Sequence, residues 1–235
     1  GTNICWTRTS LNQGNYSRIN ATCDDIPGNA RTTTNAWLKV DTIAPTISVS
    51  SSRNTTINSA LHTFSVTLNE PGNCTLNLNG TRYVNSTRAT SLTWTRTLTQ
   101  QGNYTSINYI CEDPYTNTRT SSSYWLKLDT VAPTLTWNWS SKNSTITTTY
   151  TTLCVSASER VNCTLHFNST NSVNSSTGTN ICWTRTSLNQ GNYSRINATC
   201  DDIAGNGRTT TNNWVKVDSI APTITITSSR NTTLS

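Results

Sequence analysis

Methionine is absent from this chain of 235 residues, and phenylalanine and histidine occur only twice each. Hydrophobic residues make up 33% of the chain, which is enough for several small cores but not for one large core. No apolar run approaches the length of about 20 residues that spans a bilayer. We therefore expect no membrane-spanning segment in this region, and we expect any export or anchoring signal to lie outside it.

The residue patterns of common enzymes are also missing. His62 and His166 occupy non-equivalent positions, and the chain has no Ser-His-Asp order, no nucleophile elbow and no glycine-rich phosphate loop. Glu70 and Glu159 recur at matching places, but each precedes an expected turn without a partner carboxylate, so we interpret both as solvated acids. We predict no catalytic residues and no enzymatic activity.

Charged residues account for only 12% of the chain, with a formal net charge of +6. The arginines stand singly among threonine and serine, as do Arg8, Arg18, Arg31, Arg53, Arg82, Arg96 and Arg119. Nucleic-acid sites need clustered cations that neutralise phosphates. The distribution favours a solvated, mildly cationic surface and no nucleic-acid partner.

Serine, threonine and asparagine together make up more than two fifths of the residues. Threonine is β-branched and fits a half-solvated pleated surface. Serine and asparagine compete with helical hydrogen bonding through their short polar side chains. The composition predicts an all-β protein with almost no helix.

Internal repeats define the organisation of the chain. Val40–Thr46 returns as Leu128–Thr134 and again as Val217–Thr223, at spacings of 88 and 89 residues, since 133 − 45 = 88 and 222 − 133 = 89 for the shared proline. A second period of 177 residues relates residues 1–58 to residues 178–235, which match at 48 of 58 positions. Alternate units are closer kin than neighbours, which indicates a duplicated cassette of two domains.

Apolar and polar residues alternate within each unit, which predicts about seven strands per unit. For residues 45–132 the expected strands are 46–52, 61–68, 74–78, 81–84, 92–98, 104–111 and 122–128, with turns such as Glu70–Asn73. This count is typical of an immunoglobulin-like β-sandwich, repeated as beads on a string. The expected domains are the C-terminal part of one at 1–44, two complete ones at 45–132 and 133–221, and the first strand of another at 222–235.

Two motifs resemble the tandem immunoglobulin-like repeats of prokaryotic cell-surface proteins. They are the recurring segment Val40–Thr46 at the junction between units and the turn Cys23–Asn29, which returns as Cys200–Asn206. That class includes adhesin stalks, surface-layer proteins and extracellular filament proteins. The resemblance covers the whole chain and implies an exported, extended protein that carries glycans. It specifies a repeat class and not a function, because one fold serves many functions.

The eight cysteines form no C-x-x-C pair, and with two histidines they do not make a credible zinc set. Disulfides, and hence an oxidising extracellular location at the cell surface, are the better interpretation. Cys74 and Cys111 correspond to Cys163 and Cys200, so each pair should form within its domain. The remaining Cys154 and Cys182 fall on neighbouring strands and should add a second bridge. Cys5 and Cys23 match Cys182 and Cys200, so their partners are expected outside this segment.

Fifteen N-glycosylation sequons occur. Asn73 and Asn162 are the poorer candidates because each precedes a disulfide cysteine. The predicted glycosylation sites are Asn15, Asn20, Asn54, Asn79, Asn85, Asn103, Asn138, Asn143, Asn168, Asn174, Asn192, Asn197 and Asn231.

The acidic pairs Asp24-Asp25, Glu112-Asp113 and Asp201-Asp202 lie in expected turns. Carboxylates there could bind calcium, but two per turn fall short of the six to eight oxygens that calcium takes. Capping of the turn by aspartate is the favoured interpretation, so no metal site and no cofactor other than glycans is predicted.

Tryptophan recurs at two positions of the repeat. Trp6, Trp94 and Trp183 share one position and Trp37, Trp125 and Trp214 the other, and we expect both sets to anchor a core or a junction. Trp137 and Trp139 break the repeat. Two residues apart on a strand they face the same way, so they could form an exposed platform for sugar or for a partner chain. Packing within the fold is the favoured interpretation.

Together these features favour a structural component of an extracellular filament or fibre. The alternatives are an adhesin stalk with a binding head at its tip and, less favoured, a carbohydrate-binding module. The expected partners are continuation of the same chain or further copies of it, a cell surface, or other filaments. An open sheet edge would also allow a neighbouring molecule to donate strands.

Overall fold

The structure is a computed structural model that describes residues 3–227. All the regular secondary structure within this range consists of β-strands. No helix among the described residues has the length and apolar character that a membrane crossing requires. The chain divides into two compact units, one of residues 1–55 and 61–127 and the other of residues 56–60 and 128–235.

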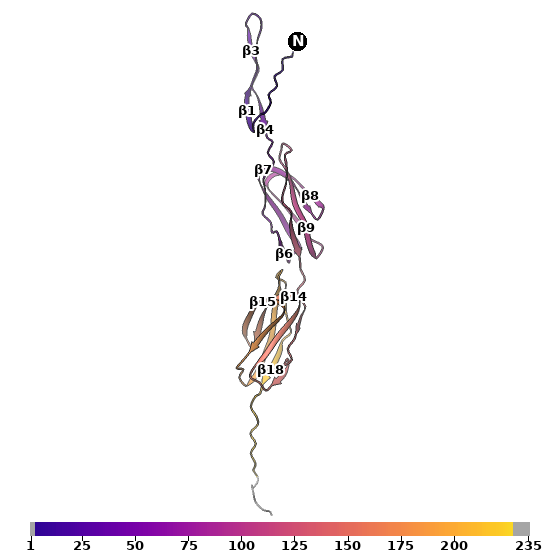
Figure 1. Ribbon diagram of the computed structural model, residues 1–235, viewed down its shortest axis with the longest axis vertical. Coiled ribbons are helices and arrows are strands. Elements are labelled where there is room, and N and C mark those ends of the chain that lie inside the picture. Colours follow the sequence, from indigo (N-terminus) through magenta and orange to yellow (C-terminus); the bar gives the residue numbers. More distant parts are fainter. Residues whose placement is uncertain (1–2, 228–235) are drawn as a thin grey trace, which may run out of the picture. The chain divides into compact units, whose positions relative to one another are not determined.

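Two seven-stranded assemblies of the same topology follow each other along the chain (Figure 1). The strands of the first sandwich are β5 (Ile47–Val49), β6 (Thr55–Ile57), β7 (Leu61–Leu78), β8 (Thr81–Thr97), β9 (Gly102–Glu112), β10 (Thr118–Thr120) and β11 (Tyr124–Leu128). They pair in the order β5-β7-β9-β11-β6, with β8 on β7 and β10 on β9.

The strands of the second sandwich are β12 (Leu135–Trp137), β13 (Ser144–Ile146), β14 (Thr151–Phe167), β15 (Thr170–Arg185), β16 (Gly191–Asp202), β17 (Gly207–Thr209) and β18 (Asn213–Val217). Their order is β12-β14-β16-β18-β13, with β15 on β14 and β17 on β16. The predicted all-β fold of tandem seven-stranded sandwiches is confirmed.

The strand boundaries differ from the prediction. Strand β7 runs without a break through Glu70–Asn73, where a turn was expected, and β8 likewise joins two expected strands. Pairing of β7 with β8 shifts register on both sides of Gly72, which marks a bulge. Proline is tolerated at bulges because it cannot donate to the ladder. A side chain at residue 72 would lie 2.8 Å from the carbonyl oxygen of Glu112, so glycine lets the strands approach.

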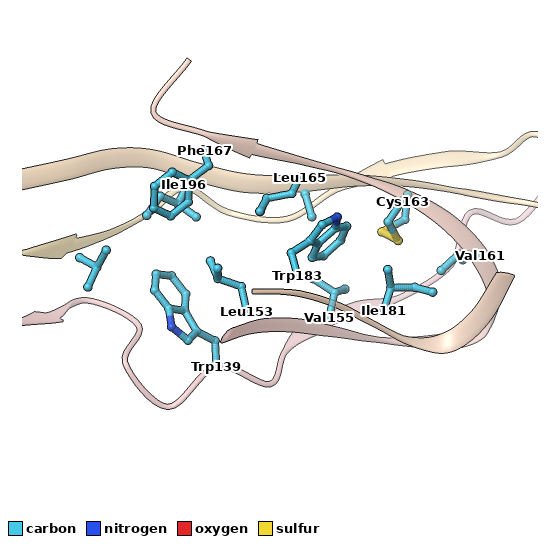
Figure 2. Close-up of a cluster of buried hydrophobic side chains, with 13 residues drawn as sticks. Trp139, Leu153, Val155, Val161, Cys163, Leu165, Phe167, Ile181, Trp183 and Ile196 are labelled. Carbon is cyan, nitrogen blue, oxygen red and sulfur yellow. A yellow bond between two sulfur atoms is a disulfide. The ribbon is translucent and has the colours of Figure 1, made fainter. Parts of the chain in front are cut away.

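Alternation along β14 builds the core of the second sandwich. Leu153, Val155 and Leu165 are buried and face Trp183 of β15 and Ile196 of β16 (Figure 2). Burial of such side chains contributes about 1.5–3 kcal/mol each. The polar faces carry threonine pairs across strands instead of apolar contacts. The hydroxyls of Thr152 and Thr184 lie 3.2 Å apart on adjacent strands, and so do those of Thr63 and Thr95.

Three disulfides join the pairs expected from the repeat, namely Cys74–Cys111, Cys154–Cys182 and Cys163–Cys200. Each links residues directly opposite each other on antiparallel strands. The first and third are buried, whereas Cys182 of the second is exposed. Three disulfides in sandwich domains are typical of extracellular modular proteins.

The N-terminal segment contains four short strands, namely β1 (Gly14–Ile19), β2 (Thr22–Asp24), β3 (Ala30–Thr32) and β4 (Ala36–Val40). They form the two-stranded sheets β1-β4 and β2-β3. Cys5 and Cys23 are unpaired and exposed here. At the other end, residues 222–227 form no strand. The remainder of the strand expected there, with the sequon at Asn231, lies outside the described residues.

The tryptophans only partly follow the prediction. Trp94 and Trp183 are buried in their cores. Trp125 and Trp214 are 41% and 44% exposed, so they do not belong to a buried core. Both occupy the second position of a strand whose first, third and fifth residues face the core, and alternation turns them outward.

For Trp137 and Trp139 the favoured interpretation as packing residues is confirmed, and the alternative of an exposed aromatic platform is wrong. Trp139 is buried, and its indole N–H donates to the hydroxyl of Thr151 over 3.0 Å. Trp139 follows the end of β12, so the same-face rule for a continuous strand does not apply to the pair. The ring centres of Trp137 and Trp139 lie 5.8 Å apart, and Trp137 is half-buried against the core.

Candidate functional site

A loop between two strands recurs three times with the same internal bonds. In the first sandwich Asp113 Oδ1 accepts from the backbone N–H groups of Tyr115 and Asn117 at 2.8 and 2.9 Å. Asp113 Oδ2 accepts from Asn117 Nδ2 at 2.7 Å. The equivalent pairs, Asp25 with Asn29 and Asp202 with Asn206, make matching backbone and side-chain bonds. The aspartate therefore caps its own turn, as the sequence predicted.

Burial alone would raise the pKa of the Asp113 carboxyl. The hydrogen bonds from Asn117 and Tyr115, with the Lys39 charge nearby, outweigh burial and leave its pKa below the ordinary value. Asp113 is consequently ionised at neutral pH and serves as a strong acceptor. The bonds from Asn29 likewise lower the pKa of Asp25.

The loop asparagine also holds the segment that leads into each sandwich. Asn117 Nδ2 donates to the carbonyl oxygen of Asp41 at 3.1 Å, and Asn206 Nδ2 donates to that of Asp129 at 2.8 Å. We call each set of aspartate, asparagine and linker carbonyl the linker clamp. A few residues later the linker is held again, because Thr46 N donates to Asn69 Oδ1 at 2.6 Å.

Carboxylates gather beside each linker clamp. The side-chain oxygens of Asp41, Glu70 and Asp113 all lie within 4.8 Å of one another. The equivalent residues Asp129, Glu159 and Asp202 form a second such triad. The interpretation of Glu70 and Glu159 as solvated acids without partner carboxylates is therefore wrong. Continuation of β7 and β14 through the expected turns carries both glutamates to the capping loops.

A signal for these triads was present in the sequence. Asp41, Glu70 and the capping aspartate each recur with the repeat period, although they are far apart along the chain. In two of the three adjacent pairs considered for calcium the members lie in different environments, because Glu112 and Asp201 are exposed while Asp113 and Asp202 are buried. Three carboxylates could hold a divalent cation, but Asp113 already accepts three hydrogen bonds, and calcium takes six to eight oxygens. Lys39 offsets part of the charge through its ion pair with Asp41 at 3.1 Å.

The two histidines have structural surroundings. His166 Nδ1 lies 2.8 Å from Asn171 Oδ1, and its Nε2 lies 3.1 Å from the Thr199 hydroxyl. His62 packs edge-on against the ring of Phe64, and burial lowers its pKa. These contacts of His62 and His166 are with asparagine, threonine and phenylalanine, and not with a carboxylate or a cysteine.

Replacing Asn117 with alanine is expected to loosen the linker. The variant loses the hydrogen bonds from Asn117 Nδ2 to the Asp113 carboxylate and to the backbone carbonyl oxygen of Asp41. A hydrogen bond to a charged group such as the carboxylate contributes about 1.5–3 kcal/mol. Hydrogen exchange followed by mass spectrometry should show faster exchange for residues 41–46 and the capping loop. Asn29→Ala is the matched control, because among the described residues the Asn29 side chain donates only to Asp25 of its own loop. Equal exchange at residues 41–46 in all three proteins would contradict the clamp.

The structure separates the predicted glycosylation sites into two groups. Four asparagines donate their Nδ2, the atom that carries an N-linked glycan, to another residue. These are Asn20, Asn85, Asn174 and Asn197, whose acceptors belong to Asn35, Thr93, Cys182 and Asn212. Among the described sequons, those with an exposed asparagine and no such donation are Asn15, Asn54, Asn79, Asn103, Asn138, Asn143, Asn162, Asn168 and Asn192. Asn162 is thus as accessible as the favoured sites, whereas Asn73 is half-buried.

Comparisons with known proteins give structural similarity only. No protein-family model and no curated protein matches the sequence. The structure is similar to the fibronectin(III)-like modules of Clostridium thermocellum CbhA, with 12% identity over 73% of this chain and 93% of that chain and a TM-score of 0.44. It is also similar to the FN1-FN3 domains of chicken CNTN1, with 8% identity over 83% of this chain and 76% of that chain and a TM-score of 0.40.

Proposed function

We propose that this chain is a non-catalytic structural part of an extracellular filament or cell-surface fibre. The observation that carries the proposal is the repeated linker clamp. The same capping loop binds the preceding linker carbonyl in both sandwiches. A protein that must stay extended gains from bonds that order each linker, since a free linker behaves as a flexible coil.

Disulfides and surface chemistry support the same role. Each complete sandwich has a buried disulfide across its central strands, which restrains the unfolded chain. Some arginines that could bind nucleic acid are engaged in the fold, because Arg96 lies 4.2 Å from the ring centre of Tyr83 and Arg185 lies 5.3 Å from that of Phe167. We propose that the partners are further repeats of the same protein and no nucleic acid.

Electron imaging of the native extracellular material tests this proposal. We expect continuous filaments in which the two-domain cassette repeats along the whole length. Stalks that end in a different head would contradict the filament and favour the adhesin alternative. Isolated compact particles would contradict both.

Glycan occupancy should follow the accessibility of Nδ2. We expect Asn79 and Asn168 to carry more glycan than Asn85 and Asn174, which lie six residues further on and donate Nδ2 to strand carbonyls. A bulky sugar needs solvent around that nitrogen. Glycopeptide mass spectrometry of the native protein measures occupancy at each site. Higher occupancy at Asn85 and Asn174 would contradict the prediction. Absence of glycan at every sequon would show that glycosylation is not part of the proposed role.

A further inference from the structure

The two disulfides of the second sandwich lie in different surroundings. Cys163 and Cys200 are 1% and 0% exposed and belong to the core. Cys154 is half-buried and Cys182 is exposed. Both strand neighbours of Cys154 are buried, and side chains alternate along a strand, so the Cys154–Cys182 bridge lies on the outer face of the β14–β15 pair. One bridge is therefore shielded from solvent, whereas the other is in contact with it.

Short polar side chains surround the outer bridge. On one side of it Thr152 lies opposite Thr184, and their hydroxyls are 3.2 Å apart. On the other side Ser156 lies opposite Asn180, and the Ser156 hydroxyl donates to Asn180 Oδ1 at 3.4 Å. Asn180 Nδ2 also donates to Cys182 Sγ at 3.7 Å. Side chains of this size leave Cys182 exposed, so a small thiol in solution can reach its sulfur atom.

The first sandwich builds the same strand pair without a bridge. Ser65 of β7 lies opposite Thr93 of β8, at the place where Cys154 lies opposite Cys182 in the second sandwich. Both members shift by one repeat, since 154 − 65 = 89 and 182 − 93 = 89. Strand β12 also pairs with β14 along its other edge, as β5 does with β7. The outer bridge can therefore open while the sheet stays formed.

We propose that the Cys154–Cys182 bridge is a thiol–disulfide exchange site whose substrate is a low-molecular-weight thiol. The bridge is then a reducible cross-link that controls how readily the β14–β15 pair opens. Exposed disulfides are more easily reduced than buried structural ones. A thiol buffer that opens this bridge consequently leaves the buried bridges Cys74–Cys111 and Cys163–Cys200 closed. The inference rests on the second sandwich and does not depend on the filament role.

The exchange takes place in two steps. A thiolate RS⁻ attacks Sγ of the more exposed Cys182, the bond to Cys154 breaks, and Cys154 leaves as a thiolate that takes up a proton. A second thiolate then attacks the R sulfur of the mixed disulfide, which releases RSSR and leaves Cys182 as a thiol. The bridge gains two electrons and two protons, and two RSH molecules become one RSSR.

Reduction of the intact 235-residue protein in glutathione buffers of increasing strength tests which bridge opens first. The free thiols of Cys5 and Cys23 are blocked with iodoacetamide beforehand. Thiols that appear later are labelled with N-ethylmaleimide and located by peptide mass spectrometry. We expect Cys154 and Cys182 to be labelled at least about tenfold faster than the four core cysteines, with a glutathionyl group on Cys182 as the intermediate. Equal or faster labelling of the core cysteines would overturn the proposal.

Hydrogen exchange at the glutathione concentration that opens only the outer bridge tests its effect on the strand pair. We expect exchange at residues 151–156 and 180–185 to rise towards that of residues 62–67 and 91–96, the unbridged equivalents in the first sandwich. Strands β16 and β18 should stay protected. Unchanged exchange at residues 151–156 would overturn the proposal, and so would an equal rise in β16 and β18, because reduction would then unfold the whole sandwich.

A double variant provides the matched control. Cys154→Ser combined with Cys182→Thr gives the second sandwich the residues that the first has at this place. We expect the variant to fold with β16 and β18 protected, to exchange at residues 151–156 as fast as the reduced protein, and to show no response to glutathione there. A variant that does not fold would mean that the fold requires the bridge, and a variant that still responds would place the response elsewhere. Either result would overturn the proposal.

Discussion

Replacing Cys163 and Cys200 together with alanine is expected to lower the free energy of unfolding of the second sandwich by about 3–5 kcal/mol. The bridge closes a sequence separation of 37 residues, and both cysteines are buried in the core. Its loss therefore frees the unfolded chain and also removes two packed sulfur atoms. Hydrogen exchange of peptides from β14 and β16 measures this sandwich separately from the other.

The second bridge of the same sandwich provides the comparison. Cys154–Cys182 spans a sequence separation of 28 residues. The stabilisation expected from restricting the unfolded chain therefore differs between the two bridges by only about 0.2 kcal/mol. Because Cys182 is exposed, we expect its replacement together with Cys154 to cost about 2–3 kcal/mol, less than loss of the buried bridge. A larger cost for Cys154–Cys182 would show that burial of the sulfur atoms is not what separates the two.

Replacing Trp183 with alanine is expected to cost about 3–5 kcal/mol, comparable with loss of the buried disulfide. Trp183 lies inside the core shown in Figure 2, among Leu153, Val155 and Leu165. Its indole N–H finds no hydrogen-bond partner among the residues that the structure describes. Trp183→Phe should therefore be tolerated much better than alanine, since it keeps most of the apolar volume and leaves no polar group unsatisfied.

Trp214→Ala is the matched control for Trp183→Ala. Trp214 is on the solvent side of β18 and is 44% exposed, so its removal should change the unfolding free energy by less than about 1 kcal/mol. Local hydrogen exchange in β14 and β16 compares the variants on one scale. A similar loss for both tryptophans would mean that the outward position makes contacts as important as those of the core.

Alternation and repetition in the sequence were enough to predict the architecture. The period of 88 or 89 residues marked each sandwich, and the matching positions of Cys74, Cys111, Cys163 and Cys200 predicted the disulfides that the structure contains. Such patterns are local or strictly periodic. Each can be detected without knowing which strands become neighbours.

The functional details could not be predicted in the same way. A turn was expected at Glu70–Asn73, because proline, glycine and asparagine favour turns in isolation. Pairing with β8 and β9 overrides that preference and makes the segment a bulged strand. The inward or outward direction of Trp125 depends on which face of β11 meets the core, and periodic recurrence alone does not contain that information.

The repeat unit, the all-β class and the cysteine pairs can be read from the sequence, because they follow from composition, period and the alternation of side chains along a strand. The joining of Glu70 to Asp41 and Asp113, and the exposure of Ile4 and Trp6 where Ile181 and Trp183 are buried, became known from the three-dimensional structure. Burial and charge clustering depend on long-range strand pairing, which sequence patterns do not contain. Identical residues behave differently when β14 is beside them and when it is not.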